Sequence, residues 1–212
     1  MATDFAALPK WLEWARRLQA ISQNGLVYAR NEFDIERYQA IRQIAAEMMA
    51  LGSNTQLHRI LDLFAGEVGY ATPKVDVRGV VFRGDALLLV REREDNRWTL
   101  PGGWADVNET PSEAVVREVF EESGYQTYAV KLLALYDRSK HAHVPSFPFR
   151  IYKLFFLCEI TGGESGRSAE TAEAAFFRAG EIPELSVSRV TASQVARFFE
   201  HPRHPEWPTE FD

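Results

Sequence analysis

Glutamates near the middle of the chain have the spacing of one face of a helix. Glu118, Glu121 and Glu122 stand at positions i, i+3 and i+4, so their carboxylates gather on that face. Like charges at this spacing repel, and negative charge near a helix C-terminus opposes the macrodipole. Arg117 can pair with one carboxylate but cannot neutralise all of them. The pattern is typical of a solvated acidic helix end or of a site for a hard divalent cation, with Mg²⁺ as the default ion.

The helix that carries these glutamates has sequence signals at both ends. Thr110 is the expected N-cap, Pro111 takes the first helical position, and Glu113 completes a Thr-x-x-Glu capping box. Gly124 supplies a left-handed stop. The sequence therefore predicts a helix between Thr110 and Gly124. Its apolar side chains have the spacing needed to pack on a sheet: Val115, Val116, Val119 and Phe120.

A longer pattern surrounds this helix. Residues 98–125 read WTLPGGWADVNETPSEAVVREVFEESGY and contain G-x5-E-x7-R-E-U-x-E-E-x-G-U, in which U is a bulky apolar residue. The matching residues are Gly103, Glu109, Arg117, Glu118, Val119, Glu121, Glu122 and Gly124, and Tyr125 occupies the last position, which is usually aliphatic. This pattern is the Nudix box, and residues 73–200 resemble the Nudix hydrolase family. By this resemblance Glu109 braces the loop.

The resemblance implies an α+β fold, the Nudix α/β/α sandwich with a mixed sheet. It also implies hydrolysis of the pyrophosphate bond in a nucleoside diphosphate linked to a variable group X, giving a nucleoside monophosphate and phosphoryl-X. Glu118 and Glu122 would be the main metal ligands, and Glu121 a ligand or the base beside the attacking water. Arg117 would orient the glutamates, and Gly102 would add a backbone carbonyl to the metal site. Mg²⁺ is the expected cofactor, with Mn²⁺ as a substitute.

The whole chain resembles a narrower bacterial Nudix group with a helical N-terminal segment, whose members act on CDP-choline or ADP-ribose. The similar stretches are residues 11–48, VDVRGVVF at 75–82 and PELSVSRVT at 183–191. The sequence leaves the choice between these substrates open. A nucleoside triphosphate pyrophosphatase or an RNA-end hydrolase would use the same box. A Nudix-derived ligand sensor is the non-enzymatic alternative, but such sensors commonly lose box glutamates, and this chain keeps all of them.

Hydrophobic periodicity divides the chain into a helical part and a part rich in strands. From Leu8 to Gly66 the apolar residues keep a helical period, which predicts a set of three helices, the last capped by Asn54 or Thr55. We therefore expect a small all-helical domain at 1–70. The expected strands of a Nudix domain at 73–205 are 74–82, 86–93, 128–137, 149–160 and 174–182, and its last helix starts at Thr191.

Candidate substrate contacts lie outside the box. Arg78 shares a strand face with apolar residues, where a charge either contacts phosphate or nucleotide or forms a structural salt bridge. Arg91, at the end of the strand before the box, has the same two interpretations. His141 and His143 belong to a loop that is either solvated or lines the substrate pocket.

Composition limits the class of partner. Of 212 residues, 24 are Lys or Arg and 30 are Asp or Glu, a formal net charge of −6, which lacks the broad basic field of a general nucleic-acid binder. No stretch has the pattern of a membrane span or an export signal. We therefore expect a cytoplasmic enzyme with a nucleotide-derived small-molecule substrate and no membrane or stable nucleic-acid partner. The amphipathic N-terminal helices also predict a homodimer, because their own segment offers too few apolar partners.

Overall fold

The computed structural model describes residues 9–166 and 170–212, and within this part the chain divides into two compact units. Of the described residues, one unit contains 9–73 together with Phe147–Arg150, and the other contains Lys74–Ser146, 151–166 and 170–212. The segment Phe147–Arg150 lies far along the chain from the helices it joins. Periodicity gave no sign of this segment, because four residues are too few to show a pattern.

The helical unit consists of α1 (Lys10–Tyr28), α2 (Glu32–Ser53) and α3 (Leu57–Ala65). Its buried core contains Leu12, Ala15, Ala45, Ala46, Met49, Ile60 and Phe64. The Phe149 ring lies 6.2 Å from the Phe64 ring, centroid to centroid. This aromatic contact explains why the distant segment belongs to the helical unit.

The turn between α2 and α3 differs from the prediction. Asn54 ends α2 with φ 52°, in the left-handed region, and its backbone N–H donates to the Ala50 carbonyl. Gln56 is the N-cap of α3 and makes no side-chain cap hydrogen bond. The prediction that Asn54 or Thr55 caps α3 was therefore wrong. Asn tolerates the left-handed conformation better than most residues, so it suits the end of a helix as well as the start of one.

The second unit is built on a mixed sheet. Within residues 9–166 and 170–212 this sheet has seven strands in the order β3-β2-β1-β5-β4-β7, with β6 paired to β2. The strands are β1 (Lys74–Arg83), β2 (Ala86–Glu92), β3 (Trp98–Thr99), β4 (Tyr125–Asp137), β5 (Ile151–Gly163), β6 (Thr171–Arg178) and β7 (Glu210–Phe211). β1 runs parallel to β5, whereas β2 runs antiparallel to β1 and β6, and β4 antiparallel to β5. The short strands β3 and β7 were not predicted, because two residues are too few to show an alternating pattern.

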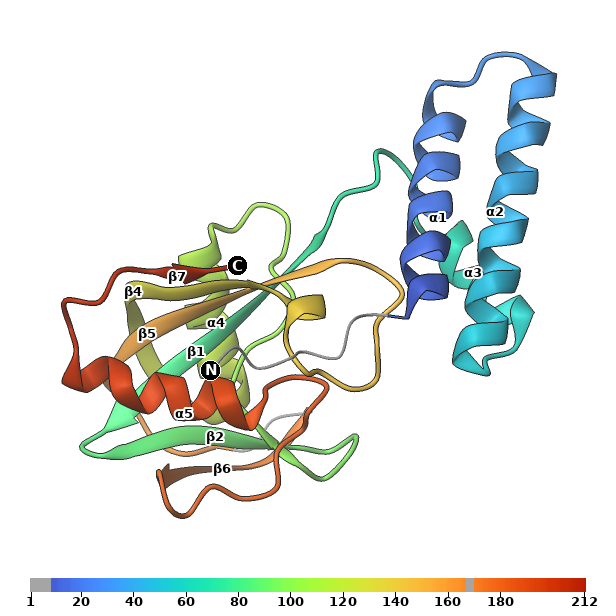
Figure 1. The fold of residues 1–212 in the computed structure, drawn as a ribbon. Helices are drawn as coiled ribbons and strands as arrows, with labels where there is room; N and C mark the ends of the chain where they lie inside the picture. Colours follow the sequence, from blue (N-terminus) through green and yellow to red (C-terminus); the bar gives the residue numbers. More distant parts are fainter. Residues whose placement is uncertain (1–8, 167–169) are drawn as a thin grey trace. The chain divides into compact units, whose positions relative to one another are not determined.

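Helices α4 (Pro111–Ser123) and α5 (Ala192–Glu200) cover opposite faces of the sheet (Figure 1). Alternation along β1 divides its side chains between the two layers, since Val77 and Val81 pack with α4 and Val80 packs with α5. The same rule places Asp76 and Arg78 on the side of Val80. The predicted α+β sandwich behind a helical N-terminal region is confirmed.

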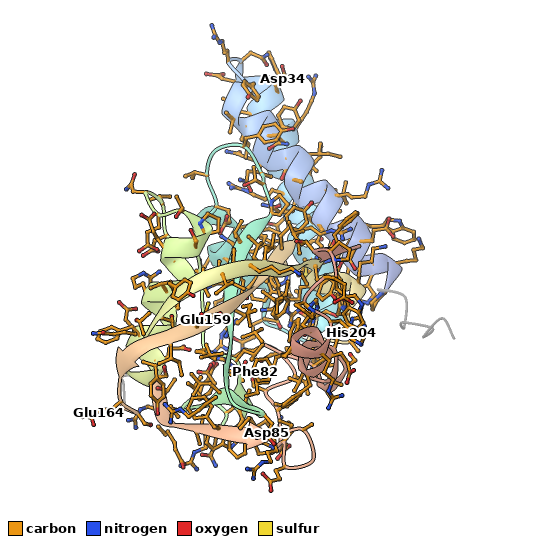
Figure 2. All side chains as sticks on the ribbon, turned by 90° about the vertical axis from the view of Figure 1, so that its left-hand side faces the viewer. Asp34, Phe82, Asp85, Glu159, Glu164 and His204 are labelled. Atoms are coloured by element: carbon orange, nitrogen blue, oxygen red, sulfur yellow. The ribbon has the colours of Figure 1, made fainter. Side chains whose placement is uncertain are left out.

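A tight hairpin joins β1 to β2 at the end of the sheet that carries Phe82 and Asp85 (Figure 2). Gly84 has φ 63° in this turn, a conformation that glycine adopts at little cost. Phe82 pairs with Leu87 across the hairpin and meets the Phe199 ring edge-on at 5.5 Å. Phe82, beside the turn, thus packs this end of β1 against α5.

Helix α4 has the ends that the sequence predicts. The Thr110 hydroxyl accepts from the Glu113 backbone N–H at 3.3 Å, and the Glu113 carboxylate accepts from the Thr110 backbone N–H at 2.8 Å. At the other end Gly124 has φ 79° and its N–H donates to the Phe120 carbonyl. Both ends of the helix are therefore held by local hydrogen bonds.

We expect Thr110→Ala to lower the free energy of unfolding by about 1 kcal/mol, because the Glu113 N–H loses its acceptor. Urea denaturation measures the change. Thr72→Ala, at an exposed linker position, is the control and should leave the midpoint unchanged. An unchanged midpoint for Thr110→Ala would contradict the role of the cap.

Candidate active site

The loop before α4 runs along β1 as if it were a further strand. Backbone hydrogen bonds of 2.8 to 3.0 Å hold it there: Val77 N–H donates to the Gly103 carbonyl, Gly79 N–H to the Pro101 carbonyl, and Ala105 N–H to the Val75 carbonyl. These bonds fix the loop backbone relative to the sheet. They bring Gly102 and Gly103 beside the last turns of α4.

Gly102 is required where the loop passes beside β1. It has φ 142°, and a Cβ at this position would lie 2.1 Å from the Val77 carbonyl oxygen, an approach that is possible only without a side chain. A Cβ on Gly103 would lie 2.9 Å from the Glu118 carboxylate oxygens, so this position leaves room for that carboxylate. The Gly102 N–H donates to Glu122 Oε2 at 2.8 Å, so the loop and the helix are also bonded directly.

Glu122 is the most buried of the box glutamates, with 4% of its surface exposed. Burial raises the pKa of its carboxyl to about 8, and the nearby Glu92 and Glu118 carboxylates add to the rise against the lowering effect of Arg78. Burial also raises the pKa of Glu118 and of Glu92. The positive charge near these carboxyl groups is therefore too small to offset the cost of ionising them in a buried site.

Arg117 organises the other acidic side chains of the box. Its Nε and Nη2 donate to the two oxygens of Glu109 at 2.8 and 3.0 Å, a bidentate pair. Its Nη1 donates to Glu118 at 2.9 Å and to Glu121 at 3.0 Å. Glu109 thus lies where it can brace the loop, and Arg117 orients carboxylates from its own helix.

The side chains of the box glutamates are of the chemical type that binds a hard divalent cation. Among the described residues no three Asp, Glu, His or Cys side chains converge as a ready metal-binding group, because Glu118 and Glu121 turn toward Arg117 and Glu122 toward Gly102. The donors are nevertheless carboxylate oxygens, which Mg²⁺ prefers. Their raised pKa values show that added positive charge would stabilise their ionised forms.

Arg78 is committed to a buried ion pair. Its Nε and Nη2 donate to the two oxygens of Asp76 at 3.0 and 2.8 Å, and its Nη1 donates to the Leu100 carbonyl at 3.1 Å. Lys153, from the neighbouring β5, donates to the same Asp76 at 2.5 Å. The structure therefore shows the salt bridge that the sequence left as one alternative. Through Leu100 it also braces the start of the loop that holds Gly102.

The other predicted substrate contacts are engaged with neighbouring side chains. Arg91 pairs with Glu173 at 3.0 Å. His141 lies 3.1 Å from Asp212, and its ring centroid is 4.2 Å from that of Tyr136. Substrate contact by Arg91 and His141 stays a prediction.

A further pair of charged residues near the site was missed. Glu92, one residue beyond Arg91, is buried and lies 2.9 Å from Arg189. The only signal in the sequence was that Arg189 belongs to PELSVSRVT, one of the stretches that resemble other bacterial Nudix proteins. A pair of residues so far apart in sequence leaves no local pattern to read.

Comparison with known proteins agrees with this geometry. The profile described as "NUDIX domain" matches residues 72–198, which are more than half of the chain. The chain belongs to the Nudix family. A second profile, "UDP-X-like, N-terminal oligomerisation domain", matches residues 9–64. The narrower resemblance to Nudix proteins with a helical N-terminal domain is thus confirmed.

Individual Nudix relatives cover most of the chain. YjhB of Bacillus subtilis, which carries a provisional name as an ADP-ribose pyrophosphatase, is 47% identical over 203 residues, covering 96% of this chain and 97% of that protein. A crystal structure of UDP-X diphosphatase matches with a TM-score of 0.62 and 27% identity. The match covers 96% of this chain and 98% of that one. The Streptococcus suis ADP-ribose pyrophosphatase structure has a TM-score of 0.60 and 40% identity, covering 66% of this chain and all of that one.

This Nudix protein is therefore an enzyme, a hydrolase that acts on pyrophosphate bonds. Across the helices within residues 9–166 and 170–212, none combines the length and apolarity needed to cross a membrane.

Proposed function

We propose that this Nudix hydrolase cleaves the pyrophosphate bond of a nucleoside diphosphate linked to X, and that ADP-ribose is its preferred substrate. The observation that carries the substrate is the 47% identity to YjhB along nearly the whole of both chains. The sequence left CDP-choline and ADP-ribose as equal alternatives, and CDP-choline has no such support. The expected products from ADP-ribose are AMP and ribose 5-phosphate. We place this activity in the cytoplasm.

We propose Glu118 and Glu122 as the main ligands of Mg²⁺, with the Gly102 carbonyl as a further ligand and Mn²⁺ as a substitute ion. The burial of Glu122, the partial burial of Glu118 and the raised pKa values of both carboxyls support this assignment. The chemistry that the ion supplies when bound is charge neutralisation on the pyrophosphate oxygens and activation of the attacking water. Glu121, whose side chain is 56% exposed, is a further ligand or the acceptor of the water proton.

The chain's own residues prepare this chemistry by positioning. Arg117 holds the Glu118 and Glu121 carboxylates. The Gly102 N–H holds the Glu122 carboxylate. The loop backbone is bonded to β1, so Gly102 is fixed relative to the sheet. The carboxylates themselves must turn from Arg117 and Gly102 to converge on an ion.

A product assay tests the proposed reaction. The full-length protein with Mg²⁺ is incubated separately with ADP-ribose, CDP-choline, a UDP-sugar, NADH, capped dinucleotides and nucleoside triphosphates, and the products are identified by mass spectrometry. We expect ADP-ribose to be cleaved with the highest kcat/KM, and reaction in ¹⁸O-labelled water to place the label on a product phosphate. Preferred release of pyrophosphate from a triphosphate would replace this proposal with a triphosphate pyrophosphatase, and preferred cleavage of a capped dinucleotide would indicate an RNA-end hydrolase.

We further propose that the protein is a homodimer formed by its N-terminal helices. Large apolar side chains on α1 and α2 are exposed in the single chain, including Phe33 at 71% and Leu51 at 86%. Light scattering at micromolar concentration should therefore give twice the mass of one chain. Leu51→Glu together with Ile44→Glu, at two exposed positions of α2, should shift the mass to that of a monomer. A wild-type monomer would contradict the proposal.

A further inference from the structure

Glu92 is a buried acid at the end of β2 that the proposed metal chemistry does not use. Only 6% of the residue is exposed. The pairing of β2 with β6 shifts register between Arg91 and Glu92, which marks a β-bulge or similar irregularity. The extra residue lies on β6, because Arg91 pairs with Glu173 and Glu92 pairs with Thr171. Such irregularities are frequent beside active sites.

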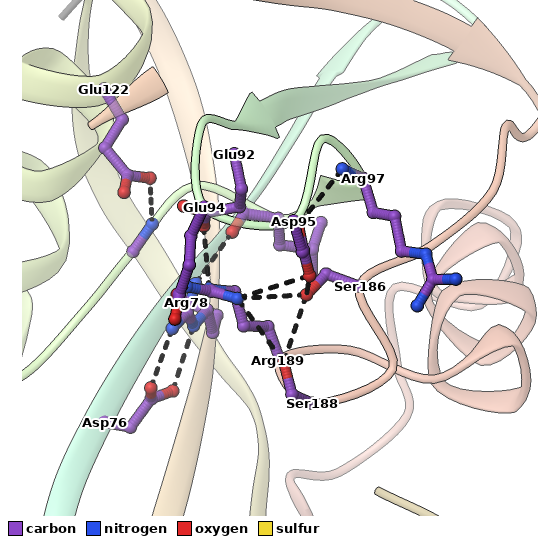
Figure 3. A network of polar contacts seen from close by, with 12 residues as sticks. Asp76, Arg78, Glu92, Glu94, Asp95, Arg97, Glu122, Ser186, Ser188 and Arg189 are labelled. Carbon is purple, nitrogen blue, oxygen red and sulfur yellow. Dashed lines mark hydrogen bonds and ion pairs between the residues drawn. The ribbon is translucent and has the colours of Figure 1, made fainter. Parts of the chain in front are cut away.

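Arg189 holds the Glu92 carboxylate from the segment that precedes α5. Its Nε lies 2.9 Å from Glu92 Oε1, and its other nitrogens lie 2.6 Å from Glu94 and 3.6 Å from Asp95 (Figure 3). The same guanidinium donates to the Ser186 hydroxyl at 3.1 Å. Arg189 is thus held in place by several acceptor oxygens, and it pairs with Glu92 from that fixed position.

The segment of Arg189 is itself fixed to the sheet. The Trp98 N–H donates to the Glu184 carbonyl at 3.0 Å, and the Ser186 N–H donates to the Trp98 carbonyl at 2.7 Å. These bonds attach PELSVSRVT to β3. The stretch that resembles other bacterial Nudix proteins therefore places a guanidinium against Glu92.

On its other side Glu92 is connected to the candidate metal site. Glu92 pairs with Thr171 across β2 and β6, and the Thr171 hydroxyl donates to the Glu122 carbonyl at 2.7 Å. Arg78 interacts electrostatically with both Glu92 and Glu122. Figure 3 draws Glu92, Glu122, Arg78 and Arg189 in one region, where Arg78 is bonded to Asp76 and Glu122 to the Gly102 N–H.

We propose that Glu92 is a positioning residue of the metal site, held by Arg189, whose negative charge beside Glu122 increases the affinity for a divalent cation. This inference rests on the proposed metal-dependent function. In this proposal Glu92 acts through its charge rather than as a ligand, with its Oε1 held at 2.9 Å from Arg189 Nε. Partners of this outer kind typically change metal affinity by about 10- to 100-fold when they are removed.

Mn²⁺ binding to the full-length protein, followed by electron paramagnetic resonance, tests the inference without measuring turnover. Glu92→Gln should weaken Mn²⁺ binding by about tenfold. Glu94→Gln is the matched control, because Glu94 pairs with the same Arg189 but its side chain is 78% exposed. It should bind Mn²⁺ like the wild type.

The double variant Glu92→Gln with Arg189→Gln separates positioning from stability. If Glu92→Gln leaves Arg189 without its buried partner and the protein unfolds, the double variant removes both charges and should restore the thermal midpoint. We expect its Mn²⁺ affinity to stay about tenfold below that of the wild type. Wild-type affinity in a folded variant that lacks Glu92 would overturn the inference.

A variant of the proposed metal ligand Glu122 distinguishes failure of the proposed metal site from failure of the role assigned to Glu92. If Glu122→Gln weakens Mn²⁺ binding strongly while variants at Glu92 bind normally, the metal site stands and the role of Glu92 fails. If the wild type itself shows no Mn²⁺ site and no pyrophosphate cleavage, the proposed function fails, and the role of Glu92 fails with it.

Discussion

Glu122→Gln should lower kcat by at least about 100-fold while the protein still folds. The change removes a charged ligand from the proposed metal site but keeps the shape of the side chain. The amide oxygen of Gln can still accept the hydrogen bond that the Gly102 N–H donates to Glu122. A neutral group also avoids the cost of burying a charge, which is the main reason that the pKa of Glu122 rises to about 8.

Steady-state kinetics with ADP-ribose at saturating Mg²⁺ measure this effect, and the thermal midpoint checks the fold. Glu184→Gln is the control, because Glu184 pairs with Arg97 at the surface, and it should keep wild-type kcat. Near wild-type turnover of Glu122→Gln would eliminate Glu122 as a ligand. A matching fall in the thermal midpoint would assign Glu122 a structural role instead.

Asp76→Asn should lower the free energy of unfolding by about 3 kcal/mol or more. Asp76 is the shared acceptor of Arg78 and Lys153, and all three side chains are buried. Without the carboxylate two buried cations face each other. Lys153 can lose its proton, since burial lowers its pKa to about 7, but the guanidinium of Arg78 stays charged.

Urea denaturation compares this variant with Asp85→Asn, which removes an ion pair with Arg178 whose side chains are 75% and 65% exposed. The surface variant should change the free energy of unfolding by less than about 1 kcal/mol. Equal effects of the two substitutions would contradict the importance of burial. Asp76→Asn should also lower kcat, because Arg78 braces the Leu100 carbonyl at the start of the catalytic loop.

The same ion pair predicts a dependence on pH. Burial by itself would raise the pKa of Asp76, but Arg78 and Lys153 lower it to about 2, below the ordinary value of 3.8. As pH falls the unfolded chain therefore takes up the proton first. The stabilisation, roughly 2 kcal/mol, is complete above about pH 4 and is lost as pH falls through about 2.

Unfolding free energies of the wild type and Asp76→Asn, measured across this range, check the sign. The difference between the two proteins should shrink as the pH falls. A constant difference would mean that Asp76 does not titrate below its ordinary pKa in the folded protein.

Helix α4 could be predicted almost completely from its own residues. Thr110, Glu113 and Gly124 end the helix through contacts within a few positions of each other, and the box glutamates share a face because of helical spacing. The hairpin turn at Gly84 is equally local. The turn at Asn54 shows the limit of such signals, because the same residue type suits either end of a helix.

The partners of the charged residues were decided by the tertiary structure alone. Parallel pairing of β1 with β5 places Lys153 beside Asp76, 77 positions away, and so turns Arg78 from a candidate substrate contact into half of a buried ion pair. The attachment of PELSVSRVT to β3 brings Arg189 to Glu92. The sequence by itself determined the family, the ends of α4 and its acidic face, because those depend on spacing along the chain. The charges that surround this face depend on strand pairing between distant segments, which no local pattern encodes.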